Sequence, residues 1–130
     1  MRDMPFETFD GREPYPLFPG VGLKAVAGDQ VFLGHVTYAP GTTVARHSHV
    51  HTEQVMLILD GSVAMTIGDE TREMRKGDVC VVNRGVEHEL HSAGGVTFIE
   101  ALGPVPLDHI ADRERDLVLG DLRGSLHVER

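Results

Sequence analysis

Residues 41–61 read GTTVARHSHVHTEQVMLILDG, and this stretch decides the fold. Two histidines, His47 and His49, alternate in it, and an amide side chain follows at Gln54. In a β-strand the side chains at positions i and i+2 lie on the same face, so both imidazoles can point into one interior. The stretch therefore predicts a strand that presents two metal ligands side by side.

The segments around this stretch are short, rich in β-branched residues and bounded by turn residues. Among the turns, Asp60-Gly61 is the strongest hairpin signal. No helical periodicity appears before residues 108–119, where we expect a short helix or a structured tail. The chain is therefore predicted to be all-β and mostly antiparallel, a sandwich or barrel. The predicted strands are 31–39, 54–60, 62–67, 79–82 and 96–102.

The length of 130 residues matches one ordinary domain. Prolines and glycines punctuate residues 1–22, which indicates an extended lead-in rather than a helix. We expect an N-terminal arm over residues 1–30, a barrel core over residues 31–105 and a C-terminal segment over residues 106–130 that packs on the barrel.

The composition argues against several classes of partner. The net charge is −8 and the basic residues are scattered, so we do not expect nucleic acid to be a partner. The apolar runs are too short to span a membrane and the N-terminus has no apolar signal region, so we expect no membrane partner and a cytoplasmic location. Cys80 is the single cysteine and is expected to behave as a small core residue.

Residues 41–61 resemble the first motif of the cupin superfamily. In that motif a glycine is followed after five residues by two histidines separated by one residue, then by an acidic ligand and, six residues later, a second glycine. Gly41, His47, His49 and Gly61 occupy the matching positions. The resemblance implies that both histidines bind a metal ion.

The position of the fourth ligand depends on the register after His49. Gln54 leaves six residues before Gly61, as the motif requires, whereas Glu53 leaves seven. Parity along the strand also places Gln54 on the same face as Met56, while Glu53 falls on the opposite face. Gln54 is the predicted ligand, and Glu53 is the alternative if the turn shifts by one residue.

A second cupin motif follows later in the chain. Gly77, Gly85 and His88 occupy its glycine and histidine positions, whereas Asn83 replaces its proline and Ser92 replaces its asparagine. Both replacements are residues that turns accept, so the ligand position is unaffected. The resemblance covers about residues 31–102 and implies the cupin double-stranded β-helix, a jelly-roll barrel, with His88 as the third imidazole ligand.

The predicted centre holds one divalent transition metal ion through His47, His49, Gln54 and His88. Imidazole and amide donors accept Zn, Fe, Ni, Mn or Cu, so the sequence does not select among them. Further residues are candidates for the pocket around the ion. The apolar candidates are Met56, Ile58, Met65 and Leu90, and the polar ones are His35, Tyr38, Arg46, His51, Glu53 and Glu100. Glu100 is compatible with either an edge or an inward position, and His91 is expected on the solvent side.

The run HSHVHTEQVMLILDG is most similar to small cupins that act on unsaturated uronates from pectin and alginate. Those chains continue into a segment like DVFSPxRxD, whereas this one reads LGPVPLDHI, so the resemblance carries over the ligand set and not the uronate substrate. A neutral amide ligand leaves the ion strongly Lewis acidic and stabilises its oxidised state less than a carboxylate would.

The leading hypothesis is therefore an isomerase, cyclase or lyase that polarises an oxygen of a small, oxygen-rich substrate. A cupin dioxygenase is the alternative, and a non-catalytic metal or metabolite sensor is the third. A homodimer is expected, because Val55, Leu57 and Leu59 form an apolar outer face that needs cover.

Overall fold

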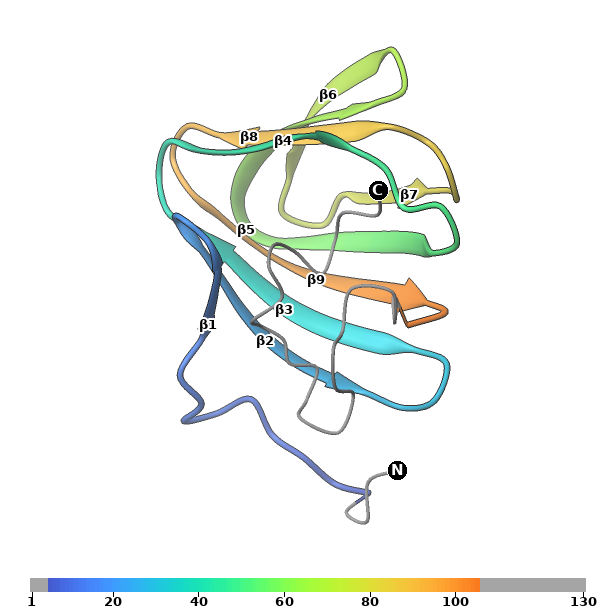
Figure 1. Ribbon diagram of the computed structural model, residues 1–130. Coiled ribbons are helices and arrows are strands. Elements are labelled where there is room, and N and C mark those ends of the chain that lie inside the picture. The colour runs from blue at the N-terminus through green and yellow to red at the C-terminus, as the bar shows by residue number, and fades with distance from the viewer. Residues whose placement is uncertain (1–4, 106–130) are drawn as a thin grey trace.

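The computed structural model describes residues 5–105, and the regular secondary structure in this part of the chain consists of β-strands (Figure 1). The helix or tail expected at 108–119 lies outside the described residues. The all-β prediction is confirmed. The strands are β1 (Tyr15–Phe18), β2 (Val21–Ala27), β3 (Phe32–Tyr38), β4 (Thr42–His47), β5 (Glu53–Ile67), β6 (Glu70–Arg75), β7 (Val79–Val82), β8 (His88–Ser92) and β9 (Val96–Gly103).

All strand pairs are antiparallel, and the curled sheet runs in the order β1-β2-β3-β9-β5-β8-β4. The long strand β5 belongs to both halves of the barrel. Its first part pairs with β9 and β7, and its second part pairs with β8 and β6. The sheet therefore folds over on itself at β5 and encloses one interior, as a jelly-roll cupin barrel does (Figure 1).

The hairpin predicted at Asp60-Gly61 is wrong, because β5 continues through both residues. Gly61 has a φ of 77° and lies next to an irregularity in the pairing with β9, between Ile58 and Asp60. A bulge of this kind bends a strand and increases its twist. Asp-Gly dipeptides generally favour hairpin turns. In this protein the dipeptide instead allows β5 to pass from one half of the barrel to the other.

A Gly61→Ala variant is expected to lose about 3 kcal/mol of unfolding free energy. The new Cβ would collide with the backbone carbonyl of Gly95 and lie 2.9 Å from the Val96 Cα, in addition to the strain of a positive φ. Gly68→Ala is the matched control, since Gly68 has a φ of 63° and a Cβ at that position would have nothing within 4 Å. That variant should lose about 1 kcal/mol. Equal midpoints in urea unfolding for the two variants would contradict this account.

The interior of the barrel contains the apolar side chains that alternate along the strands. Met56, Ile58, Met65 and Leu90 are all buried, as their parity predicts. Polar side chains are also buried, among them His49, Gln54, His88 and Glu100. Buried polar groups need partners or a function. The candidate site is therefore built on the same inward face as the core.

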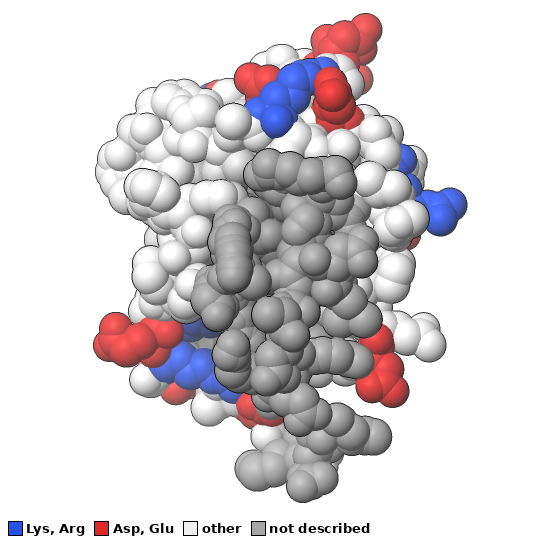
Figure 2. Space-filling model, viewed as in Figure 1, with Lys and Arg blue, Asp and Glu red and all other residues white. Residues whose placement is uncertain are grey.

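The surface carries charged groups of both signs. On the side shown in Figure 2, Lys and Arg side chains lie among Asp and Glu side chains near the upper and lower ends of the molecule. No helix in the described part of the chain is long and apolar enough to cross a membrane.

Candidate metal centre

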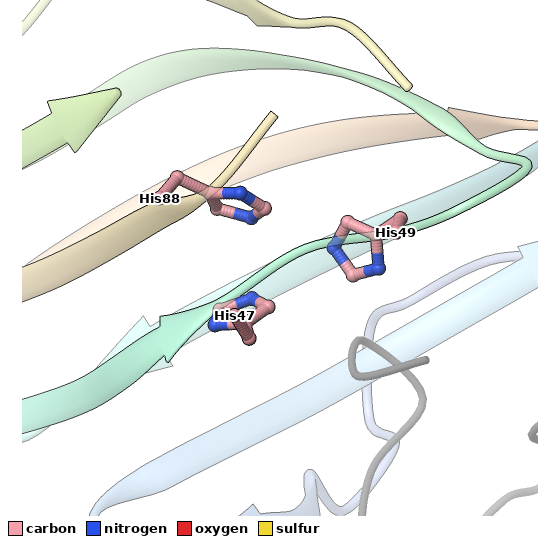
Figure 3. Close-up of side chains that lie close together, drawn as sticks. All are labelled: His47, His49 and His88. Carbon is pink, nitrogen blue, oxygen red and sulfur yellow. The ribbon is translucent and has the colours of Figure 1, made fainter. Parts of the chain in front are cut away.

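Three histidines converge at one place in the barrel. His47 ends β4, His49 lies just beyond it, and His88 begins β8, where it pairs with His47 across the two strands. One ring nitrogen from each of them lies within 4.8 Å of the others. The ring centroids of His47 and His88 are 4.2 Å apart (Figure 3). The predicted convergence of the three imidazoles is confirmed, and they are positioned to bind a metal ion.

Backbone contacts hold two of these imidazoles in place. The Nδ1 atoms of His47 and His88 lie 2.6 Å and 3.0 Å from the carbonyl oxygens of Ala45 and Val86. When Nδ1–H donates to a carbonyl, the lone pair for a metal ion lies on Nε2. His88 Nε2 is buried and makes no hydrogen bond within the described residues. The local backbone thus selects the tautomer that a metal ion needs.

His49 is held by the turn before β8. The backbone amide of Gly85 donates a hydrogen bond of 2.8 Å to the carbonyl oxygen of His49. Gly85 has a φ of 79°, which glycine adopts without strain. The glycine of the second motif therefore ties the first motif to the strand that carries His88.

The paired imidazoles of His47 and His88 are neutral at neutral pH. Burial, and to a lesser extent repulsion from His47, lower the pKa of His88 to about 4, against the opposing effect of the Val86 carbonyl. Burial also lowers the pKa of His47, while its contact with the Ala45 carbonyl raises it. Neutral imidazoles bind metal ions without first releasing a proton.

Gln54 lies on the inward face of β5 and is 4% exposed, whereas Glu53 is exposed to solvent. The Gln54 Nε2 donates a hydrogen bond of 2.7 Å to Glu100 Oε1. The Gln54 Oε1 is buried and makes no hydrogen bond to any residue of the described part of the chain. A buried amide oxygen without a partner is costly unless something binds it. Gln54 remains the predicted fourth ligand, and this oxygen is the atom that fits the role.

Glu100, whose direction the sequence left open, points inward. It is 2% exposed and lies on β9, next to β5. Burial raises the pKa of Glu100 to about 8, and the hydrogen bond from Gln54 partly opposes that shift. The sequence of β9 indicates this inward direction, because Glu100 lies on the same face of the strand as Val96, Phe98 and Leu102. These three side chains are apolar and buried.

A cavity of about 20 Å³ lies beside His47, His88, Gln54 and Glu100, whereas His49 is not among the residues that line it. That volume accommodates one ion or one water molecule. The polar side chains that line it are Tyr38, His47, Gln54, His88 and Glu100, and the apolar ones are Leu17, Phe18, Val21, Val36, Val44, Leu90 and Phe98. Of the four predicted apolar walls, Leu90 lines this cavity, and the other three pack in the surrounding core.

The remaining polar candidates lie away from the cavity. Arg46 is exposed and forms ion pairs with Glu87 and Glu89 at 2.9 Å and 3.4 Å. His51 is exposed, and His35 is half-buried near Phe9. His91 is exposed, as expected, with its Nδ1 2.6 Å from Thr43 Oγ1.

Three converging imidazoles, one unpartnered amide oxygen and a cavity of ionic size fit a divalent transition metal ion. The donors are borderline nitrogen atoms with one oxygen, which suit Zn, Fe, Ni, Mn or Cu better than Ca or Mg. With Gln54 as the predicted fourth ligand, a five- or six-coordinate ion would keep coordination positions open, as catalytic sites do.

Comparisons with known proteins agree with this geometry. The sequence model of the Cupin domain family matches residues 34–100, more than half of the chain. The tetracenomycin polyketide synthase protein TcmJ of Streptomyces glaucescens is 28% identical over 93 residues, which cover 67% of this chain and 62% of TcmJ. The chain thus spans less than two thirds of that relative.

Two solved structures share the fold. KdgF from Halomonas sp. superposes with a TM-score of 0.72 at 20% identity, covering 76% of this chain and 92% of KdgF. An RmlC-like cupin from Shewanella frigidimarina superposes with a TM-score of 0.75 at 17% identity, covering 81% of this chain and 95% of that one. At these identities the likeness is one of fold.

Proposed function

Because this chain belongs to the Cupin domain family, we propose that it is an enzyme that binds one divalent transition metal ion and acts on a small, oxygen-rich molecule. The observation that carries the proposal is the convergence of His47, His49 and His88. Gln54 lines the same cavity as His47 and His88, and its Oε1 is buried without a hydrogen bond in the described part of the chain. When bound, the ion supplies Lewis acidity for polarising a carbonyl, hydroxyl or carboxylate oxygen.

The uncharged amide in the ligand set favours redox-neutral chemistry, that is, an isomerase, a cyclase or a lyase. Three imidazoles and an amide leave the ion with a net charge near +2, which preserves its Lewis acidity and stabilises an oxidised metal less than an anionic set would. The buried carboxyl group of Glu100 contacts the amide of Gln54 and is not among the three ligating groups that lie together.

Side chains that line the cavity hold protons there and exclude water. With its pKa raised to about 8, Glu100 is protonated at neutral pH and holds a proton at the cavity wall. Burial raises the pKa of Tyr38, so its hydroxyl also keeps its proton. Val44, Leu90 and Phe98 exclude water from this wall, which strengthens electrostatic interactions there.

The relatives support a substrate rich in carbonyl or hydroxyl oxygens. TcmJ is named for a polyketide synthase, and polyketides carry many carbonyl oxygens. A β-dicarbonyl unit presents two oxygens that chelate one metal ion, and enolising it requires the transfer of a single proton. Cyclisation of such a molecule is therefore the form of the proposal that we favour.

The proposal is tested by assaying the metal-free and metal-reconstituted protein with β-polyketones and with unsaturated uronates, in air and under anaerobic conditions. We expect turnover that requires metal, does not require O₂ and is lost in His49→Ala. Strict dependence on O₂ would replace the proposal with a dioxygenase. Metal binding without turnover of either class would favour a metal or metabolite sensor.

Gln54→Ala is expected to lower the affinity for the metal ion by about 10–100-fold, since it removes the amide oxygen from the proposed ligand set. Glu53→Ala is the matched control, because Glu53 is exposed and lies on the opposite face of β5. Competition with a chromophoric chelator measures both affinities. A loss confined to Glu53→Ala would move the fourth ligand to that residue.

We propose that the chain forms a homodimer through the outer face of the sheet. Val55 pairs with Val81 and Leu57 pairs with Val79 across β5 and β7, and all four side chains are 37–57% exposed. A second copy would cover this apolar patch. Sedimentation velocity should give a dimer for the wild type and a monomer for Leu57→Glu, and a wild-type monomer would contradict the proposal. The cytoplasm remains the predicted location.

A further inference from the structure

We infer that Glu100 is a positioning residue: it fixes the Gln54 carboxamide so that the amide oxygen, and not the amide nitrogen, faces the three imidazoles. The inference rests on the proposed metal site and adds to it one residue behind the fourth ligand. Gln54 and Glu100 lie on the neighbouring strands β5 and β9, where Gln54 pairs with Leu102 and Met56 pairs with Glu100. Gln54 and Glu100 are therefore diagonal neighbours on the inward face.

The contact between them distinguishes the two ends of the amide. Gln54 Nε2 lies 2.7 Å from Glu100 Oε1, and both side chains are buried. An amide nitrogen donates only, and a carboxyl C=O or carboxylate oxygen accepts, in either protonation state of the acid. In the structure the nitrogen end of the amide lies against Glu100 Oε1, and the oxygen end is directed away from it.

Without Glu100, the orientation of the amide would be weakly defined. The terminal torsion of a glutamine side chain is broad and roughly two-fold, so the two orientations differ little in intrinsic energy. The flipped orientation would present an NH₂ group to the ligand cluster, and a donor group cannot bind a cation. This hydrogen bond thus determines whether Gln54 presents its amide oxygen or its NH₂ group to the three histidines.

The backbone leaves space for this arrangement. Gly34 on β3 lies opposite Glu100, and a Cβ there would come within 3.3 Å of Glu100 Cγ and within 2.9 Å of Phe32 Cε1. Gly34 has no unusual φ, so space rather than backbone conformation accounts for glycine at this position. A larger residue at position 34 would press on the side chains of Phe32, Leu23 and Glu100.

Glu100 acts through Gln54 rather than by binding the ion itself. Within residues 5–105, the group of ligating atoms within 4.8 Å of one another consists of the three histidines and includes no carboxylate. Glu100 therefore contacts the ligand and not the ion. Residues that hydrogen-bond to a metal ligand orient it, and their mutation typically lowers metal affinity by about 10–100-fold.

The test is a double-mutant cycle read out as metal affinity and as the visible absorption of the cobalt(II)-loaded protein. The four proteins are the wild type, Gln54→Ala, Glu100→Leu and the double variant. We expect Glu100→Leu to lose about 10–100-fold in affinity and to take on the cobalt spectrum of Gln54→Ala. The double variant should bind no more weakly than Gln54→Ala alone. Glu100→Gln keeps an acceptor for Gln54 and should restore most of the affinity.

Two outcomes would overturn the inference. Wild-type affinity and spectrum in Glu100→Leu would show that Gln54 orients itself, and an equal loss in the Gln54→Ala background would show that Glu100 acts on the ion directly. Should Glu100→Leu fail to fold, NMR of the metal-free wild type decides the question. There the two Gln54 side-chain NH protons should be well separated and slow to exchange, and free-amide shifts would contradict the contact. Absence of metal binding in the wild type would instead refute the proposed function.

Discussion

His88→Ala is expected to bind the metal ion about 100–1,000-fold more weakly than the wild type. Site binding energies of about 10–16 kcal/mol shared among four ligands assign roughly 2.5–4 kcal/mol to each one. His88 is fully buried, and its Nε2 makes no hydrogen bond inside the described segment, while its ring lies beside the other two imidazoles (Figure 3). The variant should therefore retain well below one equivalent of metal after dialysis, as measured by elemental analysis.

His91→Ala provides the matched control for this variant. His91 lies on the same strand, β8, but is exposed and contacts Thr43 rather than the cluster. It should keep the full equivalent of metal and the wild-type unfolding midpoint. Equal metal contents in the two variants would show that the imidazole at position 88 does not contribute to binding.

Glu100→Gln is expected to stabilise the metal-free protein by roughly 3–5 kcal/mol near pH 8 relative to the wild type. The folded-state pKa of Glu100 is raised to about 8 from an ordinary 4.5, chiefly by burial. Below the ordinary pKa of 4.5 the carboxyl is protonated in both states and has no effect. As the pH rises toward 8, the unfolded state ionises while the folded state does not, so the wild type loses stability.

The measurement is urea unfolding of both metal-free proteins from about pH 4.5 to about pH 9.5. The difference between their unfolding free energies should grow with pH across that window and level off above about pH 8. Glutamine keeps an acceptor for Gln54, so the hydrogen bond that Glu100 makes is not lost with the charge. A difference that is constant with pH would mean that Glu100 ionises as freely as an exposed carboxyl.

The motif residues could be placed from sequence because their geometry is local. Gln54 rather than Glu53 is buried, as the two-residue period required. His47 and His49 reach one cluster, although His49 lies beyond the end of β4. The apolar interior followed from the same rule. Such features depend on one strand at a time, so a single sequence is enough to predict them.

Other features depend on contacts between distant segments. The Asp60-Gly61 pair has the composition of a hairpin, but Gly61 packs against the Gly95 backbone and β5 continues through both residues. The strand β6, with the sequence ETREMR, buries only Met74, so its alternation could not be detected. The inward direction of Glu100 was visible in the β9 alternation, although its partner Gln54 became clear only from the strand register.

Anomalous diffraction from crystals of the metal-loaded protein tests the central claim most directly. We expect one strong peak inside the barrel, about 2.0–2.2 Å from a ring nitrogen of each of His47, His49 and His88 and from Gln54 Oε1. A loaded protein whose metal peak lies elsewhere, with these four side chains in contact only with one another or with water, would contradict the account.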